Sequence, residues 1–353
     1  MYSEDFWILN NSDQIAELNN IKKHYVVYLY RLPTNGKLAS QWMIKEKRKH
    51  ILVTGHHRSG TTWVGRTIAH HEDIELVYEP FNPDFVRYNF EYKFDYWFEH
   101  TPTSPKKDKI QKVFDDYLPQ NFIQYPAKIC RESGNSLKTP LIFLKYLMLS
   151  HQRPRFLLKD PIALLSAGWL YERYGLKVIC TSRHPLAFAG SLKKQNWDFD
   201  FKNFYNQNKL MNGLFKPFRE DVEQVLDDSD FIDRIALLWN MLNYVILHYQ
   251  EKYPEWYFAK QEQIALEPVD QFKRIYHYLG LDFNRETQEY VNLYTSGKNP
   301  ESAKSNRYQP RNAQKTLNTW RKRLTVEEAE RVIDATEKIC SKLYEQQPEY
   351  YNI

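Results

Sequence analysis

The chain has 353 residues, of which 42% are hydrophobic and 26% are charged. This balance is typical of folded globular proteins and excludes a disordered or collagen-like chain. The 49 Lys and Arg residues exceed the 44 Asp and Glu residues only slightly, so the formal net charge is +5. Such a mild excess favours anionic ligands, but it gives no support to a nucleic-acid-binding protein.

The chain ends and the cysteines suggest where the protein works. The N-terminal sequence has acidic residues near its start and lacks the apolar segment of a secretory signal. No stretch approaches the roughly 18 apolar residues of a membrane-spanning helix. Cys130, Cys180 and Cys340 are far apart, which argues against a disulfide framework or a zinc ribbon. We therefore expect a cytoplasmic protein, with peripheral membrane contact through the basic, aromatic residues 22–49 as an open alternative.

Short apolar segments alternate with helical patterns along the chain. Five segments predict β-strands, at residues 51–53, 75–77, 156–158, 178–180 and 256–259. Helical patterns follow four of them, at residues 61–71, at 163–173, from 185 onward and at 269–279. This alternation indicates βαβ units, and therefore an α/β fold with a central parallel sheet flanked by helices.

Two helix-like segments, residues 84–150 and 201–253, interrupt this alternation. We expect them to be helical insertions that cap a cleft at the carboxyl edge of the sheet, where ligand sites are usually built. The main domain then spans residues 48–345, after an N-terminal helical extension (1–47) and before a tail (346–353). Thr325 and Glu328 predict a capping box at the start of the last helix.

The strongest motif joins the first predicted strand to the first predicted helix. It reads Gly55-His56-His57-Arg58-Ser59-Gly60-Thr61-Thr62-Trp63. The two glycines allow backbone conformations and close approaches that side chains would block. Backbone N–H groups at a helix N-terminus form a cradle for an anion, and the threonine hydroxyls and the Arg58 guanidinium add further donors. The motif therefore predicts a site for a phosphate or sulfate ester.

The same loop differs from the Walker A loop of kinases. A Walker A loop continues from its second glycine into a lysine, but Thr61 occupies that position here. A P-loop kinase acting on a small molecule is therefore the first alternative, and a non-catalytic nucleotide-binding protein on the same fold is the second. His56 and His57 also stay open: they are structural or solvent-facing loop residues, or one of them is an alternative base.

A second candidate anion site follows the fourth predicted strand. Arg183 lies just beyond this strand, Pro185 can begin the next helix, and Ser191 lies eight residues after Arg183. Eight helical residues rise by about 12 Å, so the arginine has to reach back along the helix to share a ligand with the serine. A dianionic phosphate needs charge-assisted partners of this kind.

These two motifs resemble the sulfotransferase family. The string from Arg58 to Trp63 resembles that family's 5′-phosphosulfate loop, and the Arg-x7-Ser pair resembles its 3′-phosphate site. The resemblance implies 3′-phosphoadenosine 5′-phosphosulfate (PAPS) as the sulfuryl donor, 3′,5′-diphosphoadenosine (PAP) as the product, and no metal. The residues it implies as nucleotide contacts are Arg58, Ser59, Gly60, Thr61, Thr62, Trp63 near the adenine, Arg183, Ser191, and Arg307 and Arg311 in a basic loop.

Two further residues are candidates for the chemistry. Glu79 lies just past the second predicted strand, before a proline, in a context that resembles the base of the carbohydrate and tyrosylprotein branches. Lys159 begins a Lys-Asp-Pro string that resembles the tyrosylprotein branch, where the lysine assists the leaving group; Asp160 is expected to cap the following helix. The resemblance implies in-line sulfuryl transfer to a hydroxyl of a carbohydrate or small metabolite. Glu79 is then the base, and Arg58 and Lys159 stabilise the developing charge.

Overall fold

The computed structural model describes residues 49–84, 92–118, 155–227, 229–300, 312–344 and 351. All of them belong to one of the two units into which the chain divides, the unit made of residues 49–302 and 310–353. The predicted extension 1–47, much of the insertion 84–150 and most of the tail 346–353 lie outside the described residues. The domain boundaries proposed from the sequence stay predictions.

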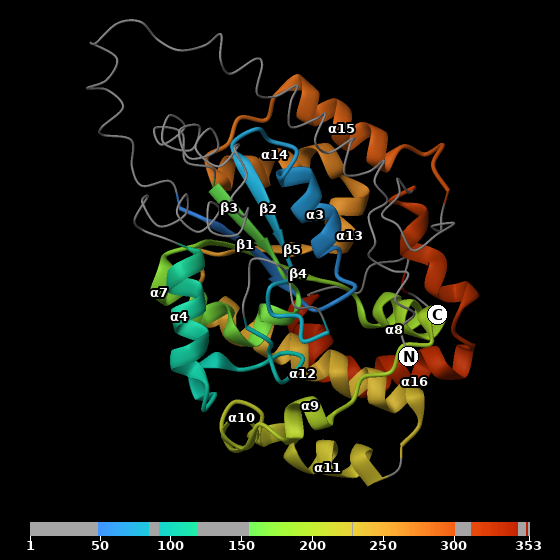
Figure 1. Cartoon of the computed structure of the whole chain (residues 1–353). Helices are drawn as coiled ribbons and strands as arrows, with labels where there is room; N and C mark the ends of the chain where they lie inside the picture. Colours follow the sequence, from blue (N-terminus) through green and yellow to red (C-terminus); the bar gives the residue numbers. More distant parts are fainter. Residues whose placement is uncertain are drawn as a thin grey trace, which may run out of the picture. The chain divides into compact units, whose positions relative to one another are not determined.

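A five-stranded parallel sheet forms the centre of this unit (Figure 1). Its strands stand in the order β2-β3-β1-β4-β5, and every neighbouring pair is parallel. Their bounds are β1 (Ile51–Gly55), β2 (Ile74–Tyr78), β3 (Arg155–Lys159), β4 (Lys177–Ser182) and β5 (Tyr257–Lys260). All five strands predicted from the sequence are confirmed, each within about two residues of the expected ends.

The two faces of the sheet are buried in separate hydrophobic cores, which explains why the strand sequences are mostly apolar. On β1, Leu52 belongs to one core, whereas Ile51 and Val53 belong to the other. On β3, Leu158 and Leu157 divide in the same way. Successive side chains of a strand point to opposite faces, so a sheet covered on both sides needs apolar residues at every position.

Helices cover both faces of the sheet (Figure 1). The core beneath one face contains residues of α3, α13, α14 and α15, and the core beneath the other contains residues of η4, α7, α8, α12 and α16. The α-helices are α3 (Thr61–Ile68), α4 (Lys107–Tyr117), α7 (Ala167–Tyr174), α8 (Pro185–Gln195), α9 (Lys202–Tyr205), α10 (Asn208–Asn212), α11 (Arg219–Asp227), α12 (Phe231–Lys252), α13 (Gln261–Leu266), α14 (Pro268–Leu279), α15 (Arg285–Thr295) and α16 (Val326–Leu343). The 3₁₀ turns are η2 (Thr101–Thr103), η4 (Ile162–Ser166), η5 (Lys216–Phe218) and η6 (Lys315–Lys322).

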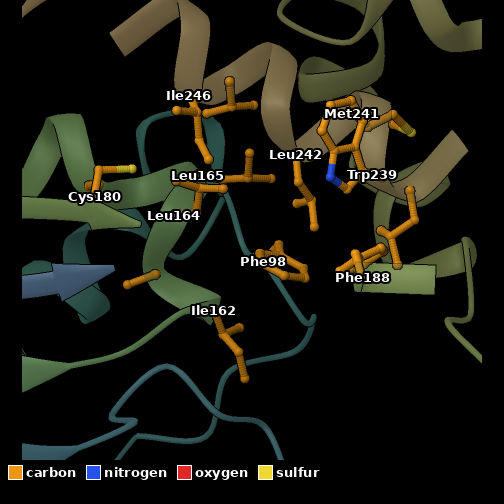
Figure 2. Close-up of a cluster of buried hydrophobic side chains, with 14 of the residues drawn as sticks. Phe98, Ile162, Leu164, Leu165, Cys180, Phe188, Trp239, Met241, Leu242 and Ile246 are labelled. Atoms are coloured by element: carbon orange, nitrogen blue, oxygen red, sulfur yellow. The ribbon is translucent and has the colours of Figure 1, made fainter. Parts of the chain in front are cut away.

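The predicted helices are confirmed, with one difference after the third strand. There the chain makes the 3₁₀ turn η4 before α7, instead of one continuous helix. The insertion at residues 201–253 is helical as expected, and its longest helix, α12, contributes to the larger core (Figure 2). Phe98, from the described part of the other insertion, lies in the same core beside Leu164 and Leu165 of η4 (Figure 2).

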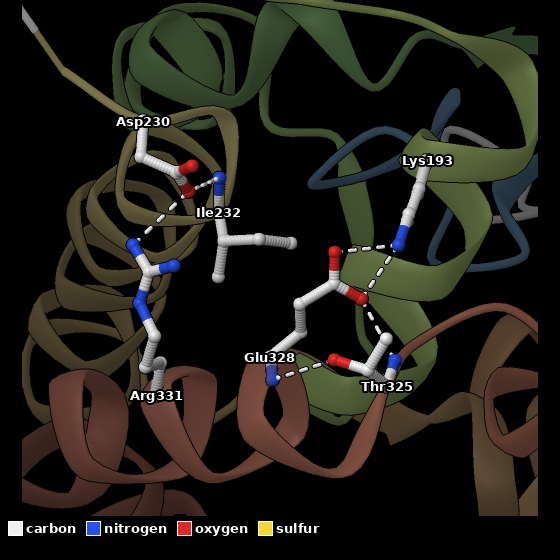
Figure 3. Close-up of polar contacts among 6 residues, drawn as sticks. All are labelled: Lys193, Asp230, Ile232, Thr325, Glu328 and Arg331. Carbon is white, nitrogen blue, oxygen red and sulfur yellow. Dashed lines mark hydrogen bonds and ion pairs between the residues drawn. The ribbon is translucent and has the colours of Figure 1, made fainter.

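The last helix, α16, is attached to α8 at its first turn (Figure 3). The predicted capping box is confirmed: the Thr325 hydroxyl accepts a hydrogen bond of 3.1 Å from the Glu328 N–H, and the Glu328 carboxylate accepts one of 2.7 Å from the Thr325 N–H. The same carboxylate contacts the Lys193 ammonium of α8 at 2.5 Å. The cap therefore also fixes the helix that carries Ser191.

A second set of polar contacts joins α16 to α12, which lie against each other (Figure 3). Asp230 caps α12 by accepting a hydrogen bond of 2.8 Å from the Ile232 N–H. Arg331 of α16 donates to Asp230 at 3.0 Å and pairs with Asp233 at 2.8 Å. Contacts of this exposed kind stabilise only modestly, so the buried faces of the two helices provide most of the attachment.

Three properties relevant to function can be read from the described ranges. No helix in them is both long and apolar enough to cross a bilayer. Cys180 and Cys340 are free thiols. Within the same ranges, no three His, Cys, Asp or Glu side chains are grouped so that they could hold a metal ion.

Candidate active site

The loop between β1 and α3 depends on its two glycines. Gly55 has a φ of 136°, and a Cβ there would meet the Thr181 carbonyl oxygen at 2.0 Å. Gly60 caps α3 with a φ of 92°, and a Cβ there would meet Gln261 at 3.1 Å. Any larger residue would therefore strain the backbone and displace β4 or the residue after β5. The glycines keep the α3 N-terminus close to the ends of the neighbouring strands.

The remaining loop residues divide between structural and ligand-facing positions. Ser59 is fully buried and shares a hydrogen bond of 2.6 Å with the Thr181 hydroxyl, so it fastens the loop to β4. Thr61 and Thr62 occupy the first turn of α3, where free N–H groups and the helix dipole favour an anion. Trp63 packs against Phe272 with ring centroids 5.7 Å apart, and its place near the adenine stays a prediction.

His56 holds the loop to the residue after β4. Its Nδ1 donates to the His57 carbonyl at 2.9 Å, so its Nε2 accepts the hydrogen bond of 2.9 Å from the Arg183 N–H. Burial lowers the pKa of His56 to about 4, because desolvation disfavours the charged imidazole. His57 is buried as well. Of the interpretations left open by the sequence, the solvent-facing one is therefore wrong for both histidines.

Arg58, Arg183 and Ser191 come together at the carboxyl end of β4. Arg58 Nε donates to the Ser191 hydroxyl at 2.9 Å, and Arg183 donates through a terminal nitrogen to the Arg58 carbonyl at 3.2 Å. Arg58 has a positive φ of 66°, a backbone conformation that is uncommon for residues other than glycine. The sequence placed Arg58 at the sulfate and Ser191 at the 3′-phosphate. The structure brings the two side chains into direct contact.

The Arg183 side chain is a buried cation with an unused donor. It is 9% exposed, and its Nε atom has no hydrogen-bond partner among the described residues. The ion pairs of the described ranges include no carboxylate bound to this guanidinium. A buried charge is costly unless it is paired, so this position favours an anionic ligand.

The backbone around Arg183 is fixed from two further sides. Trp239 of α12 donates from its indole to the Arg183 carbonyl at 2.8 Å. The buried Glu262 accepts a hydrogen bond of 3.0 Å from the next N–H, that of His184. The sequence analysis missed Glu262, although its place two residues past the fifth strand was the same signal that pointed to Arg183 and Lys159.

Glu262 also links this region to the end of the chain. Its carboxylate accepts hydrogen bonds of 3.0 Å from the hydroxyls of Tyr344 and Tyr351. The Tyr351 ring stacks on His184 with centroids 3.6 Å apart. Burial lowers the pKa of His184 to about 3, so its ring is neutral in this stack.

On the other side of the loop, Glu79 and Lys159 form an ion pair across the ends of β2 and β3. The side chains are 14% and 2% exposed, respectively. The second carboxylate oxygen of Glu79 accepts a hydrogen bond of 3.1 Å from Asn82. Glu79 also has a positive φ of 48°, and a strained non-glycine backbone of this kind is often found at functional sites. The predicted base is thus in direct contact with the lysine that was predicted to stabilise the developing charge.

The aliphatic stem of Lys159 is fitted against α3 and β2. A Cβ at Gly65 of α3 would meet the lysine Cγ at 2.8 Å, so only glycine leaves room for the stem. The ammonium lies 3.8 Å from the centre of the Tyr78 ring. Such a cation–π contact stabilises a desolvated ammonium. These contacts direct Lys159 toward the carboxyl edge of the sheet.

Asp160 has the capping role predicted for it. Its Oδ1 accepts hydrogen bonds from the Ile162 and Ala163 N–H groups at 2.9 and 3.2 Å. Its Oδ2 accepts one of 2.6 Å from the Phe81 N–H. Burial raises the pKa of Asp160 to about 7, with a further contribution from the negative charge of Glu79. Asp160 therefore fixes the segment that follows Glu79 to the end of β3.

The C-terminal segment reaches the helix that carries Ser191. The Trp320 backbone approaches Gly190 so closely that a Cβ on this glycine would meet the Trp320 Cα at 3.0 Å. Lys315 begins the 3₁₀ turn η6 that contains Trp320. Arg307 and Arg311 lie outside the described residues, and their assignment to the nucleotide stays a prediction.

The strand order places the two groups of residues on opposite sides of the loop. β1, which leads into the loop, lies between β3 and β4. The pair of Glu79 and Lys159 follows β2 and β3, whereas Arg183 follows β4. An anion bound at the α3 N-terminus would thus have a carboxylate–ammonium pair on one side and a free guanidinium donor on the other.

A comparison with protein families identifies this arrangement. The model described as "Sulfotransferase family" matches residues 50–285, which contain β1 to β5 and all the described candidate residues named above except those of the C-terminal segment. Since this match spans more than half of the chain, the protein belongs to the sulfotransferase family.

Individual relatives are distant. The chain is 20% identical over 347 residues to "Carbohydrate sulfotransferase 1" of Danio rerio, covering 85% of this chain and 77% of that protein. Among solved structures, sulfotransferase STF9 from Mycobacterium avium is 13% identical, covers 88% of this chain and 80% of its own, and has a TM-score of 0.41. Mouse sulfotransferase SULT7A1 complexed with PAP is 14% identical, covers 87% and 89%, and has a TM-score of 0.38. These TM-scores are too low to support an argument about details of the site.

Proposed function

We propose that the protein transfers a sulfuryl group from PAPS to a hydroxyl group of a carbohydrate or another hydroxylated metabolite. The observation that carries this proposal is the geometry at the carboxyl edge of the sheet. A glycine-bounded anion loop there separates the Glu79–Lys159 pair from the buried, incompletely paired guanidinium of Arg183. Family membership supports the reaction class, and the carbohydrate sulfotransferase relative supports the kind of acceptor.

The residues present fit a nucleotide with phosphates at two positions. The orphaned Nε of Arg183 offers a charge-assisted hydrogen bond to a 3′-phosphate. Ser191 lies within reach of the same group, because Arg58 already bridges the serine and the loop. Thr61, Thr62 and the free N–H groups of the first turn of α3 would hold the 5′-phosphosulfate.

When bound, PAPS would supply the sulfuryl group, whose S–O bond to the 5′-phosphate breaks as the acceptor oxygen bonds to sulfur. Glu79 accepts the proton of the acceptor hydroxyl at a carboxylate oxygen. Asn82 holds Oε2 of this carboxylate, while Lys159 Nζ lies beside Oε1. The ammonium of Lys159 and the guanidinium of Arg58 stabilise negative charge on the oxygen that leaves with the nucleotide.

Calorimetry with nucleotides tests the nucleotide assignment. PAP should bind more tightly than adenosine 5′-phosphate, and its binding should not require Mg²⁺. If ATP with Mg²⁺ bound tightly and PAP did not, the kinase alternative would replace this proposal.

Mass spectrometry tests the transfer itself. Hydroxylated compounds are incubated with the protein and PAPS, and a sulfated product is detected as the gain of one SO₃ group. Tight PAP binding without any transfer across a broad set of acceptors would favour the non-catalytic alternative.

A further inference from the structure

His57 has no role in the proposed reaction, and its environment is unusual. Its side chain lies directly before Arg58 in the anion loop and is only 7% exposed. Neither ring nitrogen has a hydrogen-bond partner among the described residues. Buried polar groups in folded proteins are nearly always paired, so an imidazole with two unpaired nitrogens requires a physical explanation.

Aromatic rings surround this imidazole. The ring centroids of Trp197, Phe188 and Phe98 lie 4.3, 5.1 and 5.8 Å from that of His57. Phe98 has a positive φ of 59°, so the chain accepts a strained backbone to place this ring. Burial, followed by the charges of His56 and Arg58, holds the pKa of His57 well below its ordinary value. The ring is therefore neutral and offers one N–H donor and one nitrogen acceptor.

Two half-buried indoles extend this aromatic group toward the surface. Trp197, which contacts His57, lies 5.6 Å from Trp97 between ring centroids. The Trp97 indole N–H donates to the Asp84 carboxylate at 3.2 Å. Partly exposed aromatic faces beside a carboxylate combine an apolar platform with a hydrogen-bond acceptor, which is the usual composition of a small-molecule site.

The same line of contacts continues to the proposed base. The Asn82 side-chain oxygen accepts a hydrogen bond of 3.0 Å from the Asp84 N–H, and the Asn82 side-chain nitrogen donates to Glu79 at 3.1 Å. His57 and Glu79 are thus joined by a series of contacts through four residues, namely Trp197, Trp97, Asp84 and Asn82, in which Asp84 contributes both its carboxylate and its backbone N–H. This series connects the anion loop to the end of β2, the two places that the proposed reaction requires on either side of the acceptor oxygen.

We propose that the Trp97–Trp197 pair binds the apolar face of a pyranose ring, while His57 hydrogen-bonds a hydroxyl of that sugar next to the one that is sulfated. This inference rests on the proposed function and assigns the acceptor side of the same site. A sugar ring has C–H groups on its faces and hydroxyls at its edge, so it matches a platform with donors and acceptors at its rim. A neutral imidazole can donate to one hydroxyl oxygen and accept from one hydroxyl hydrogen.

A buried water molecule is the competing explanation for the unpaired nitrogens, since such waters commonly satisfy buried polar groups. The variant His57→Phe separates the two explanations. Phenylalanine keeps an aromatic ring among Trp197, Phe188 and Phe98 and removes both nitrogens. The melting temperature of the nucleotide-free protein should rise if the nitrogens are unsatisfied, and should stay about equal if a water molecule satisfies them. Only a hydrogen bond from His57 to the acceptor predicts that kcat/KM for the acceptor falls in this variant.

The experiment uses the full chain, PAPS, and the p-nitrophenyl glycosides of glucose, galactose and N-acetylglucosamine. Calorimetry with PAP comes first and tests the nucleotide site separately; the wild type and His57→Phe should bind PAP equally. For a glycoside that the wild type sulfates, kcat/KM should fall by about tenfold or more in His57→Phe, which is the loss expected when two hydrogen bonds to the acceptor are removed. His57→Gln, which keeps a donor and an acceptor, should recover part of this loss. His248→Phe, at an exposed position of α12, is the matched control.

Each outcome bears on the assignment. A reduced kcat/KM with unchanged PAP affinity and unchanged or higher melting temperature supports it. An unchanged kcat/KM in His57→Phe overturns the role of His57. The sugar assignment is overturned if PAP binds but none of the three glycosides is sulfated. If the wild type does not bind PAP, the proposed function itself fails, and the acceptor assignment fails with it.

Discussion

The two ends of the site differ in how their charges are satisfied. At the ends of β2 and β3, Glu79 and Lys159 neutralise each other. At the end of β4, the Arg183 side chain is also buried, yet among the described residues it hydrogen-bonds to the uncharged Arg58 carbonyl and pairs with no carboxylate. Burying a cation without a counter-charge costs desolvation free energy, and a bound anion would offset that cost. The paired end is suited to proton transfer and the unpaired end to holding the nucleotide.

The difference is built into the backbone as well as the side chains. At the unpaired end, His56 fixes the N–H of Arg183 and Trp239 fixes its carbonyl, so the guanidinium starts from a rigid base. At the paired end, Asp160 fixes the chain two residues beyond Glu79. Rigid support around reactive side chains is what a preorganised site requires. The following predictions test whether the two ends have separate roles.

The largest effect is expected at the paired end. Glu79→Gln should lower kcat by about 10²–10⁴-fold, the usual loss when a general base is removed. PAP affinity, measured by calorimetry, should change little, because the residue is proposed to contact the acceptor. Glu72→Gln, at an exposed position before β2, serves as the control. Normal turnover in Glu79→Gln would mean that the base has been assigned to the wrong residue.

The next largest effect is expected at the unpaired end. Arg183→Ala should weaken PAP binding by about 10–100-fold, which corresponds to the loss of charge-assisted hydrogen bonds. Adenosine 5′-phosphate, which has no 3′-phosphate, should bind the variant and the wild type about equally. Arg285→Ala, at an exposed position of α15, is the matched control. If the two nucleotides lost affinity equally, Arg183 would not be the residue that binds the 3′-phosphate.

Acid should destabilise the unpaired end through its buried histidines. The pKa of His56 in the folded protein is about 4, below the ordinary value of 6.5, so the unfolded chain takes up the proton first. The stability is fully present above about pH 6.5 and is lost as the pH falls toward 4. The slope approaches about 1.4 kcal/mol per pH unit for each such histidine. The raised pKa of Asp160 acts in the opposite direction over the same range, so urea unfolding between pH 7 and 5 has to be compared between the wild type and His56→Gln. An equal pH dependence of the two free energies of unfolding would contradict the buried neutral state of His56.

The smallest effect is expected away from both ends. Thr325→Ala removes the cap of α16 and should lower the free energy of unfolding by about 1 kcal/mol. Thermal unfolding measures the change. PAP affinity should stay at the wild-type value, since α16 supports α8 without contacting the proposed nucleotide site. A large loss of PAP affinity would show instead that the capped end of α16 positions Ser191 more directly than its contacts indicate.

The sequence predicted those parts of the fold and site that depend on short-range patterns. The strands were readable because both faces of the sheet are covered, which gives each strand a short run of apolar residues. Glu79, Lys159 and Arg183 were readable because each follows a parallel strand directly, and the carboxyl ends of parallel strands meet at one edge. The cap at Thr325 was readable because the capping box is a local motif.

What the sequence did not predict depends on contacts between distant residues. Arg58 hydrogen-bonds to Ser191, which is 133 positions away in the chain, and has a positive φ that no local pattern specifies for an arginine. The burial of His56 and His57 depends on aromatic residues more than 40 positions away in the chain, such as Phe188 and Trp197. Glu262 was missed for a different reason: its position past the fifth strand was informative but was not used.

Gly65 shows how Lys159, which we propose to be catalytic, constrains a helix that it does not belong to. Glycine in a helix interior costs about 1 kcal/mol relative to alanine, so a search for stabilising substitutions would select this position first. An alanine methyl group would nevertheless lie 2.8 Å from the Lys159 side chain. Replacement at residue 65 would therefore improve the intrinsic propensity of α3 while displacing the ammonium from Glu79. Attempts to make this enzyme more heat-resistant should leave that glycine in place.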